Sequence, residues 1–241
     1  AMALGLIHQK GTLDSIENAD MVFVSIPVEA ITKLLPQILD KVGENTLVVD
    51  FGSTKTAICE AVATHPKRDQ FLAAHPIAGT EFSGPDAAIS NLYDGKTMML
   101  CEVAHTRPDL LQRAENLLKE LNMVVRHMDP IAHDRHIAYV SHLSHITSFM
   151  LGKTVLEKET DEQNIFDMAG SGFASTVRLA KSSPEMWMPI FIQNKDNVLE
   201  TLNEYISNLN AFKEKLEAEA VEELLADMKD INRIKSILKH K

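Results

Sequence analysis

The chain has 241 residues, 45% of them hydrophobic and 24% charged, which is typical of a globular protein with one large or two smaller domains. Its 34 acidic residues outnumber its 24 basic ones and no basic stripe is present, which argues against binding to nucleic acid. The two cysteines lie in apolar segments and no apolar run is long enough to cross a membrane. We therefore expect a cytoplasmic protein with neither disulfides nor membrane contact.

Short apolar runs alternate with helical patterns as far as about residue 128. Several of these runs are rich in Val and Ile and do not alternate with polar residues, which is typical of strands buried on both faces. The predicted strands are 21–26, 47–51, 71–77, 97–103 and 124–128, and the predicted helices between them are 28–42, 54–64 and 108–121. Because strands and helices alternate, we expect a largely parallel sheet.

From residue 132 onward the pattern is helical throughout. Apolar residues recur every three or four positions in 197–216 and again in 221–238. Such stripes must be buried, either against a partner subunit or within an intramolecular helix pair, and the pattern alone does not choose between them. The predicted fold class is therefore α/β and then all-α, with the boundary near Asp129 and Pro130.

The glycine-rich fingerprint G-x-G-x-x-G, which opens a Rossmann sheet, does not occur in this sequence. The first residues read as the end of a helix followed by a strand. Since the fingerprint belongs to a unit of roughly 30 residues that precedes such a strand, we expect it upstream of Ala1. On this interpretation the chain represents a truncated Rossmann-type parallel sheet.

His75 follows an apolar, strand-like stretch and begins the run HPIAGTEFSG. Ligands of open α/β sheets bind outside the carboxyl ends of the strands, so an imidazole at this point is placed for chemistry. The alternative is a loop histidine bonded to a backbone carbonyl, and this feature taken alone favours the alternative.

Five motifs occur in a fixed order along the chain. They are ADMVFVSIPV from Ala19, VVDFGSTK from Val48, HPIAGTEFSG from His75, MDPIAHDRHIAYVSHLSH from Met128 and GSGFASTVRLAKSSPEMW from Gly170. In this order and spacing the set resembles the prephenate dehydrogenase family, from residue 5 to about residue 216. The resemblance implies NAD(P)-dependent oxidative decarboxylation of prephenate to 4-hydroxyphenylpyruvate in tyrosine biosynthesis.

The same resemblance implies the domains and the partners. Residues 1–129 would form a partial dinucleotide-binding domain of Rossmann type, and residues 130–241 an all-helical domain for substrate binding and dimerisation. The expected partners are a small-molecule substrate and a second copy of the chain, joined through the C-terminal helices. The cofactor would be NAD or NADP, because the acidic residue that reads the ribose is expected upstream of the chain.

Roles for individual residues also follow from the resemblance. His75 would accept the proton of the ring hydroxyl, for which an imidazole pKa near 6.5 is suited. Ser53 would bond near this hydroxyl and the nicotinamide, and Ser25 and Pro27 would lie at the cofactor. Ser53 could also be the N-cap of the predicted helix 54–64, and the two roles can coexist.

Prephenate is a dianion, so its pocket needs fixed positive charge, and a guanidinium can bind a carboxylate through two hydrogen bonds. Arg178 matches the family's carboxylate-binding arginine. His145 resembles a histidine that contacts substrate, with Ser141 one helical turn before it, and Glu81 is expected to gate the pocket. Trp187 either packs behind the arginine or touches substrate.

One motif departs from the family pattern. Many members have three glycines, a phenylalanine, a basic residue and an aspartate, whereas this chain has GSGFAS from Gly170. The role of Ser171, at the second glycine position, stays open. Because the charged pair is missing, the sequence does not decide between prephenate and its amino counterpart arogenate.

The sequence allows three other interpretations. The pairs His133/His136 and His142/His145 have a spacing that can converge on zinc, but no cysteine or obvious third ligand accompanies them, so no metal is expected. A β-hydroxyacid dehydrogenase would need a catalytic lysine, and neither Lys181 nor Lys195 lies in a motif of that group. A non-catalytic dimeric module is the remaining alternative, and the retention of several separated polar groups argues against it.

Overall fold

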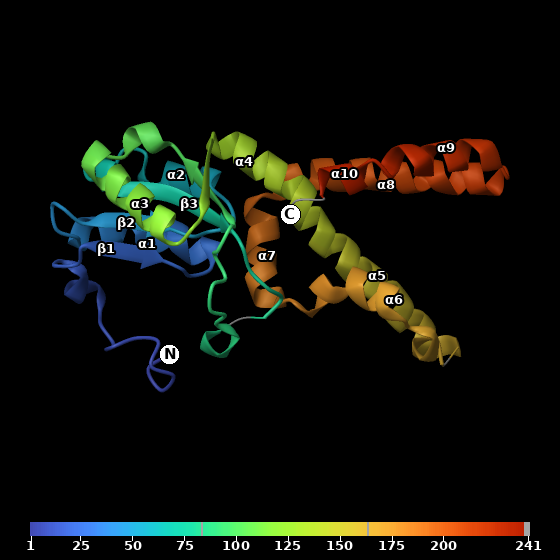
Figure 1. The fold of residues 1–241 in the computed structure, drawn as a ribbon, viewed down its shortest axis with the longest axis horizontal. Coiled ribbons are helices and arrows are strands. Elements are labelled where there is room, and N and C mark those ends of the chain that lie inside the picture. Colours follow the sequence, from blue (N-terminus) through green and yellow to red (C-terminus); the bar gives the residue numbers. More distant parts are fainter. Residues whose placement is uncertain (83, 163, 239–241) are drawn as a thin grey trace. The chain divides into compact units, whose positions relative to one another are not determined.

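The computed structural model describes residues 1–82, 84–162 and 164–238 (Figure 1). The chain divides into two compact units, Ala1–Val198 and Leu199–Lys241. The first unit contains a sheet and the helices around it, and the second contains the greater part of one long helix with the two helices that follow. None of the helices in the described ranges combines the length and hydropathy needed to cross a membrane.

A five-stranded sheet lies at the centre of the first unit, with its strands side by side in chain order. These strands are β1 (Met21–Val24), β2 (Leu47–Asp50), β3 (Phe71–Ile77), β4 (Thr97–Cys101) and β5 (Val124–Met128). Three of the pairings are parallel, namely β1 with β2, β2 with β3 and β4 with β5. The largely parallel sheet predicted from the alternating pattern is confirmed.

The pairing of β3 with β4 is antiparallel, which the alternating pattern does not predict. Parallel neighbours need a crossover connection, usually a helix. Between Ile77 and Thr97, the described residues form only a short 3₁₀ turn (Pro85–Ala87) together with turns and bends. The chain therefore returns directly beside β3 in the opposite direction.

Helices cover both faces of the sheet. On one face lie α1 (Val28–Lys41) and α2 (Thr56–Val62), and on the other lies α3 (Pro108–Glu120) (Figure 1). Successive residues of a strand point to opposite faces, so Val48 of β2 joins the core beneath α1 and α2 while Val49 joins the core beneath α3. Burial on both faces explains why these strands are apolar throughout.

Asp129 marks the start of the helical part. Its side chain accepts hydrogen bonds from the backbone amides of Ile131 (2.9 Å) and Ala132 (3.1 Å), and Pro130 occupies the first turn, where no amide is needed. The helical elements that follow are α4 (Pro130–Ile137), a π-helical turn (Ala138–His142), α5 (Leu143–Glu162), α6 (Ser171–Thr176), a 3₁₀ turn (Arg178–Lys181), α7 (Pro184–Gln193), α8 (Lys195–Glu217), α9 (Val221–Ile231) and α10 (Ile234–Ile237).

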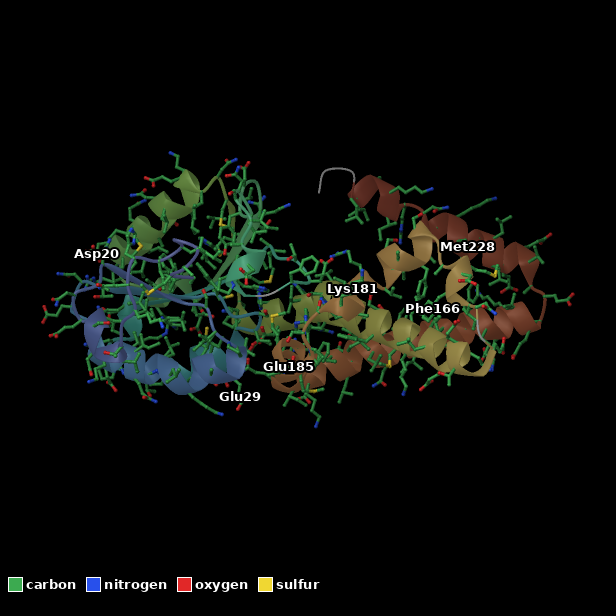
Figure 2. The ribbon with its side chains drawn as sticks, turned by 90° about the horizontal axis from the view of Figure 1, so that it is seen from below. Asp20, Glu29, Phe166, Lys181, Glu185 and Met228 are labelled. Carbon is green, nitrogen blue, oxygen red and sulfur yellow. The ribbon has the colours of Figure 1, made fainter. Side chains whose placement is uncertain are left out.

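The first helices of this part pack on the sheet domain. α4 contacts α2, and α7 contacts α1, where Val28 forms a small core with Trp187 and Ile190. Charged side chains such as Asp20 and Glu29 lie at the surface (Figure 2). A functional division at residue 129 stays a prediction, since by compactness α4 to α7 belong to the same unit as the sheet.

The second unit carries an ion pair between its two longer helical segments, from Lys215 of α8 to Asp227 of α9 (2.6 Å). Several of its apolar side chains are exposed in the single chain. They include Ile206, Leu209, Phe212, Leu216, Val221, Leu225, Met228 and Ile231. These residues belong to the stripes that the sequence predicts to be buried, either against a partner subunit or within an intramolecular helix pair.

Candidate active site

His75 lies at the point where β3 extends past β2. The last residue of β3 that pairs with β2 is Ala73, whereas His75 still pairs with Met99 of β4. Its partly buried ring meets the ring of His133 edge-on, and the two imidazoles are joined by a hydrogen bond of 2.9 Å between Nδ1 of His75 and Nε2 of His133. The imidazole therefore contacts a helix of the second half of the chain, and the printed sequence gives no local sign of this.

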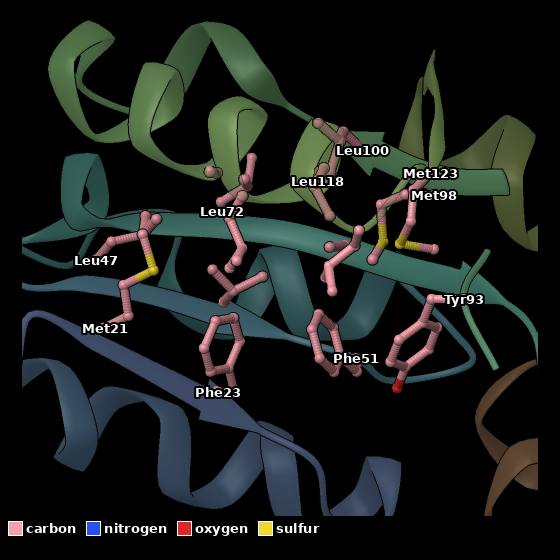
Figure 3. Close-up of a pocket in the computed structure, with 15 residues that line it drawn as sticks. Met21, Phe23, Leu47, Phe51, Leu72, Tyr93, Met98, Leu100, Leu118 and Met123 are labelled. Atoms are coloured by element: carbon pink, nitrogen blue, oxygen red, sulfur yellow. The ribbon is translucent and has the colours of Figure 1, made fainter. Parts of the chain in front are cut away.

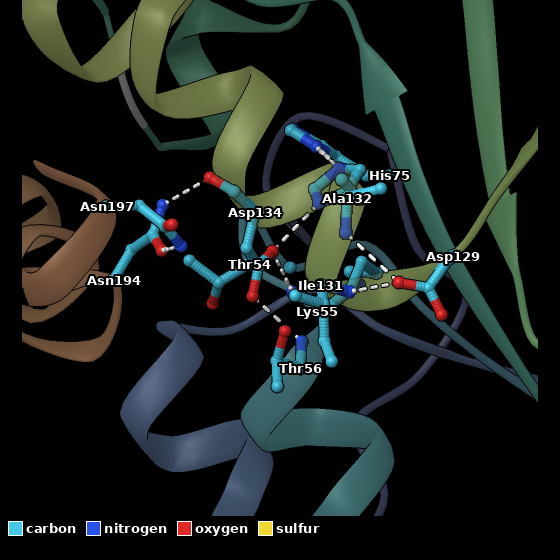
Figure 4. Close-up of polar contacts among 12 residues, drawn as sticks. Thr54, Lys55, Thr56, His75, Asp129, Ile131, Ala132, Asp134, Asn194 and Asn197 are labelled. Carbon is cyan, nitrogen blue, oxygen red and sulfur yellow. Dashed lines mark hydrogen bonds and ion pairs between the residues drawn. The ribbon is translucent and has the colours of Figure 1, made fainter. Parts of the chain in front are cut away.

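Asp134, the neighbour of His133 on α4, accepts hydrogen bonds from three donors (Figure 4). Its carboxylate lies 2.8 Å from Nδ1 of His133 and accepts from the backbone amides of Lys55 (2.7 Å) and Thr56 (2.9 Å). Burial by itself would raise the pKa of Asp134, but these hydrogen bonds outweigh it and lower the pKa below its ordinary value. Asp134 is therefore an ionised acceptor in the interior.

The same carboxylate explains how α2 begins. The interpretation of Ser53 as an N-cap is wrong, because α2 starts at Thr56 and its first amides bond to Asp134 instead. Ser53 lies upstream of this start and is partly exposed. Sequence reasoning looks for a cap just before a helix, whereas this one comes from a residue far along the chain.

Lys55 is a buried cation that the sequence analysis did not single out. Its ammonium pairs with the carboxylate of Asp50 and donates a hydrogen bond to the backbone carbonyl of Ala74 (2.7 Å), directly before His75. Burial raises the pKa of Asp50, while the Lys55 ammonium and the amides of Gly52 and Ala74 oppose the change. The only hint in the sequence is the Asp50–Lys55 spacing inside one motif.

The environment of His75 favours its neutral form. Burial lowers the pKa of His75 well below 6.5, and the positive charge of Lys55 acts in the same direction. A neutral imidazole can accept a proton, so His75 is a base near neutral pH.

A second group of aromatic and polar side chains forms around His145 on α5. Nδ1 of His145 donates to the backbone carbonyl of Ser141 (3.0 Å), and the ring of His145 stacks on Trp187 with 3.5 Å between ring centroids. Burial lowers the pKa of His145. Trp187 is itself buried and packs against His145.

Arg178 and Glu81 form an ion pair of 2.7 Å. Arg178 begins the 3₁₀ turn before α7, and Glu81 lies in the loop after β3. The Arg178 side chain is 51% exposed and the Glu81 side chain 13% exposed, so the guanidinium keeps donors available on its open side. A hydrogen bond from its own backbone amide and the contact with Arg178 lower the pKa of Glu81.

The other predicted positions lie apart from these contacts. Ser25 and Pro27 are exposed between β1 and α1, and Ser171 is exposed on α6. Lys181 and Lys195, the lysines considered for another dehydrogenase group, are also exposed.

The histidine pairs considered for zinc have other contacts. Within the described part of the chain, no three His, Cys, Asp or Glu side chains come together as a metal site would require. His142 is buried beside Asn194 (3.2 Å) and packs edge-on against Trp187, and burial lowers its pKa to about 4. His133 instead belongs to the contact with His75.

The carboxyl edge of the sheet offers groups that fit the nicotinamide end of a dinucleotide. Ser25 and Pro27 follow β1, Ser53 follows β2, and all three are at least partly exposed at the edge where open α/β sheets bind such ligands. On the neighbouring strand β3, the neutral His75 lies just beyond the last residue that pairs with β2.

An apolar cavity of about 270 Å³ lies between the sheet and α3 (Figure 3). Phe23, Phe51 and Met98 are among its lining residues, and Tyr93 contributes the one ionisable side chain of that lining. Apart from Tyr93 the lining is apolar and carries no positive charge for an anion, so the polar edge remains the candidate site.

Fold and site together define the class of two-part proteins in which an α/β nucleotide-binding domain is followed by a helical domain. Residues 1–127 match the family domain described as prephenate dehydrogenase, nucleotide-binding domain, and residues 129–230 match prephenate dehydrogenase, dimerization domain. The chain belongs to the prephenate dehydrogenase family.

Individual relatives agree with this assignment. Over 228 residues the chain is 30% identical to prephenate dehydrogenase of Bacillus subtilis, covering 93% of this chain and 62% of that protein. It is 25% identical over 227 residues to cyclohexadienyl dehydrogenase of Zymomonas mobilis, covering 94% and 78%. The chain thus spans less than two thirds of the length of the Bacillus subtilis relative.

A solved structure shows the same fold. The crystal structure of prephenate dehydrogenase from Aquifex aeolicus in complex with hydroxyphenyl propionate and NAD+ has a TM-score of 0.86 and 32% sequence identity to this chain. The match covers 98% of this chain and 83% of that one.

Proposed function

We propose that the protein carries out the NAD-dependent oxidative decarboxylation of prephenate to 4-hydroxyphenylpyruvate, a step of tyrosine biosynthesis. The observation that carries this proposal is the neutral His75 at the carboxyl edge of the sheet, held against α4. A base at this edge lies where a bound nicotinamide and its substrate meet. Membership of the prephenate dehydrogenase family names the substrate class.

His75 accepts the proton of the substrate's ring hydroxyl through Nε2, because its Nδ1 is occupied by His133. The bound cofactor supplies the acceptor for the hydride that leaves the carbon bearing this hydroxyl. As the hydroxyl carbon becomes a carbonyl, the bond to the ring carboxylate breaks and carbon dioxide leaves. Its electron pair moves through the ring to the carbonyl oxygen, which makes the ring aromatic, and this oxygen takes a proton back to give the phenol of the product. Ser53, beyond β2, donates or accepts beside the same hydroxyl.

The substrate's negative charge is bound by Arg178, whose open side is available for a carboxylate. Nδ1 of His145 is engaged by the Ser141 carbonyl, so Nε2 of His145 is the atom offered to substrate. Glu81 holds Arg178 in place, and in this way the loop after β3 contributes to the pocket.

We propose prephenate in preference to arogenate on the basis of the Glu81–Arg178 pair. Arogenate carries an ammonium group where prephenate carries a keto oxygen, and an ammonium needs an acidic partner. Glu81 already pairs with Arg178, and the GSGFAS segment offers no carboxylate in place of the family's aspartate.

The cofactor residues that we propose are Ser25, Pro27 and Ser53, and the cofactor is NAD+ in preference to NADP+. The Aquifex aeolicus relative was solved with NAD+. We also propose a homodimer, since residues 129–230 match a dimerization domain and the exposed apolar stripes of α8 and α9 need a partner.

Steady-state assays with each substrate and each cofactor test the proposal. We expect prephenate and NAD+ to give reduced cofactor, carbon dioxide and 4-hydroxyphenylpyruvate in equal amounts. Faster turnover of arogenate would overturn the substrate assignment, and faster reduction of NADP+ would overturn the cofactor assignment. If no pair of substrate and cofactor reacts, the non-catalytic alternative is correct.

A further inference from the structure

We infer that His133 and Asp134 are positioning residues that hold His75 with its proton on Nδ1 and its Nε2 lone pair directed to the substrate. This inference deepens the proposed function and rests on it for its role in catalysis. The evidence is a continuous set of hydrogen bonds from the start of α2, through α4, to the end of β3 (Figure 4).

The direction of these hydrogen bonds is set at Asp134. Its carboxylate receives the backbone amides of Lys55 and Thr56, which can only donate. Asp134 is 4% exposed, and its two oxygens accept from separate amides, Oδ1 from the buried Lys55 and Oδ2 from the partly buried Thr56. A proton on either oxygen would weaken one of these hydrogen bonds, so the ionised form is favoured. Asp134 therefore accepts from His133, and the proton of this bond lies on Nδ1 of His133.

The proton position on His75 follows from that on His133. A neutral imidazole with a proton on Nδ1 has an acceptor at Nε2. Nε2 of His133 lies 2.9 Å from Nδ1 of His75, so Nδ1 of His75 must donate. Nε2 of His75 is then the acceptor, and among the described residues it has no hydrogen-bond partner.

Both histidines are also held in orientation. His133 is 2% exposed, and its ring is fixed at one end by Asp134 and at the other by His75. The two amides that bind Asp134 belong to Lys55 and Thr56, which follow Ser53 closely in the chain. The relay, meaning the hydrogen bonds from these amides through Asp134 and His133 to His75, therefore fixes the position of His75 relative to Ser53. General-base catalysis depends on both the tautomer and this geometry.

Two substitutions at position 133 separate the acceptor from the rest of the ring. His133→Leu removes the acceptor for His75, whereas His133→Gln places an amide oxygen within reach of Nδ1. We expect His133→Leu to lower kcat about 100-fold with KM for prephenate changed less than about threefold, and His133→Gln to recover at least about tenfold of the loss. His136→Leu, an exposed histidine of the same helix, is the matched control.

Nuclear magnetic resonance reads the tautomer without any need for turnover. In protein labelled with ¹⁵N-histidine, long-range proton–nitrogen correlations show which ring nitrogen carries the proton. We expect His75 and His133 both to be protonated on Nδ1 and bare on Nε2. In His133→Leu we expect the His75 signals to report a mixture of the two tautomers.

The outcomes distinguish this inference from the proposed function. If the protein oxidises prephenate but His133→Leu keeps kcat within about threefold of the original, the positioning role is refuted and the function stands. If His75 carries its proton on Nε2, the relay is refuted whether or not the protein is active. If the protein oxidises no substrate but shows the expected tautomers, the arrangement is correct and the proposed function fails.

Discussion

At the scale of single residues, the site depends on one imidazole kept neutral by its surroundings. Burial and the nearby positive charge of Lys55 disfavour a proton on His75. A base with a pKa well below neutral is a weaker base, yet it is in the accepting form at neutral pH and above. Catalysis then depends on orientation, which the contact with His133 provides.

The lowered pKa of His75 predicts the pH dependence of kcat/KM. Since the neutral form is the active one, activity is complete above the pKa of His75 and is lost as the pH falls through it. Because that pKa lies below 6.5, kcat/KM for prephenate should be level from 6.5 upward and decline only at more acidic pH. If kcat/KM declined with a midpoint above pH 6.5, the group whose protonation abolishes activity would not be His75.

Arg178 predicts a separation between binding and chemistry. Arg178→Ala should raise KM for prephenate about 10- to 100-fold, the loss of a charge-assisted contact, and change kcat less. It also leaves the Glu81 carboxylate unpaired and repulsive to the dianion. Arg178→Lys should therefore be intermediate, and the double variant with Glu81→Gln should recover part of the loss. Equal KM values for all variants would exclude Arg178 from the pocket.

What the sequence reveals differs among these residues. His75 and Arg178 stand in recognisable motifs, so their positions could be predicted. The contacts of His75 with His133 and of Lys55 with Asp134 join residues 58 and 79 positions apart, and no local pattern indicates such pairs. Lys55 is also missed because a lysine in a glycine-containing turn normally lies in solvent.

At the scale of elements, the strands were predicted to within two residues at each end, because strands buried on both faces have a distinct apolar composition. The antiparallel pairing of β3 with β4 and the start of α2 were not predicted. Both depend on the tertiary path of the chain. The antiparallel pairing results from a connection without a long helix, and the start of α2 results from capping by the Asp134 carboxylate of α4.

Asp134 of α4 caps the start of α2, whereas Asp129 caps only its own helix. We therefore expect substitutions of these two aspartates to lower the free energy of unfolding by different amounts. Asp134→Ala leaves His133 and the backbone amides of Lys55 and Thr56 without an acceptor, which should lower the free energy of unfolding by about 3 kcal/mol. Asp129→Ala removes an exposed N-cap and should cost about 1 kcal/mol. Urea unfolding followed by the fluorescence of Trp187 measures both, and equal losses would contradict the account.

This stabilisation should also depend on pH. Because the pKa of Asp134 is lower in the folded protein than its ordinary value of 3.8, the carboxylate stabilises the fold above that pH, and the contribution is lost as the pH falls through the lowered pKa. The difference between the original protein and Asp134→Ala should shrink over the same range.

At the scale of the whole molecule, the second unit exposes apolar residues that a single chain does not cover. Leu209 and Phe212 of α8 are about half exposed in a segment that matches the family's dimerization domain. A surface of this kind is stable when a second copy buries it.

Light scattering on purified protein should therefore give twice the mass of the 26.8 kDa chain. The double substitution Leu209→Glu with Phe212→Glu should shift the protein toward the monomer, while Asn210→Glu, which adds a charge to the same helix, should not. A dimer that survives the double substitution would place the interface elsewhere.

The kinetics of His75→Asn show whether His75 removes the proton of the substrate hydroxyl. Asparagine keeps a polar side chain of similar size near Nδ1 but offers no base at the position of Nε2. We expect kcat for prephenate oxidation to fall by about 10²- to 10⁴-fold while KM stays within about threefold. A variant that retains the kcat of the original protein would contradict the account, because another group would then have to accept the proton.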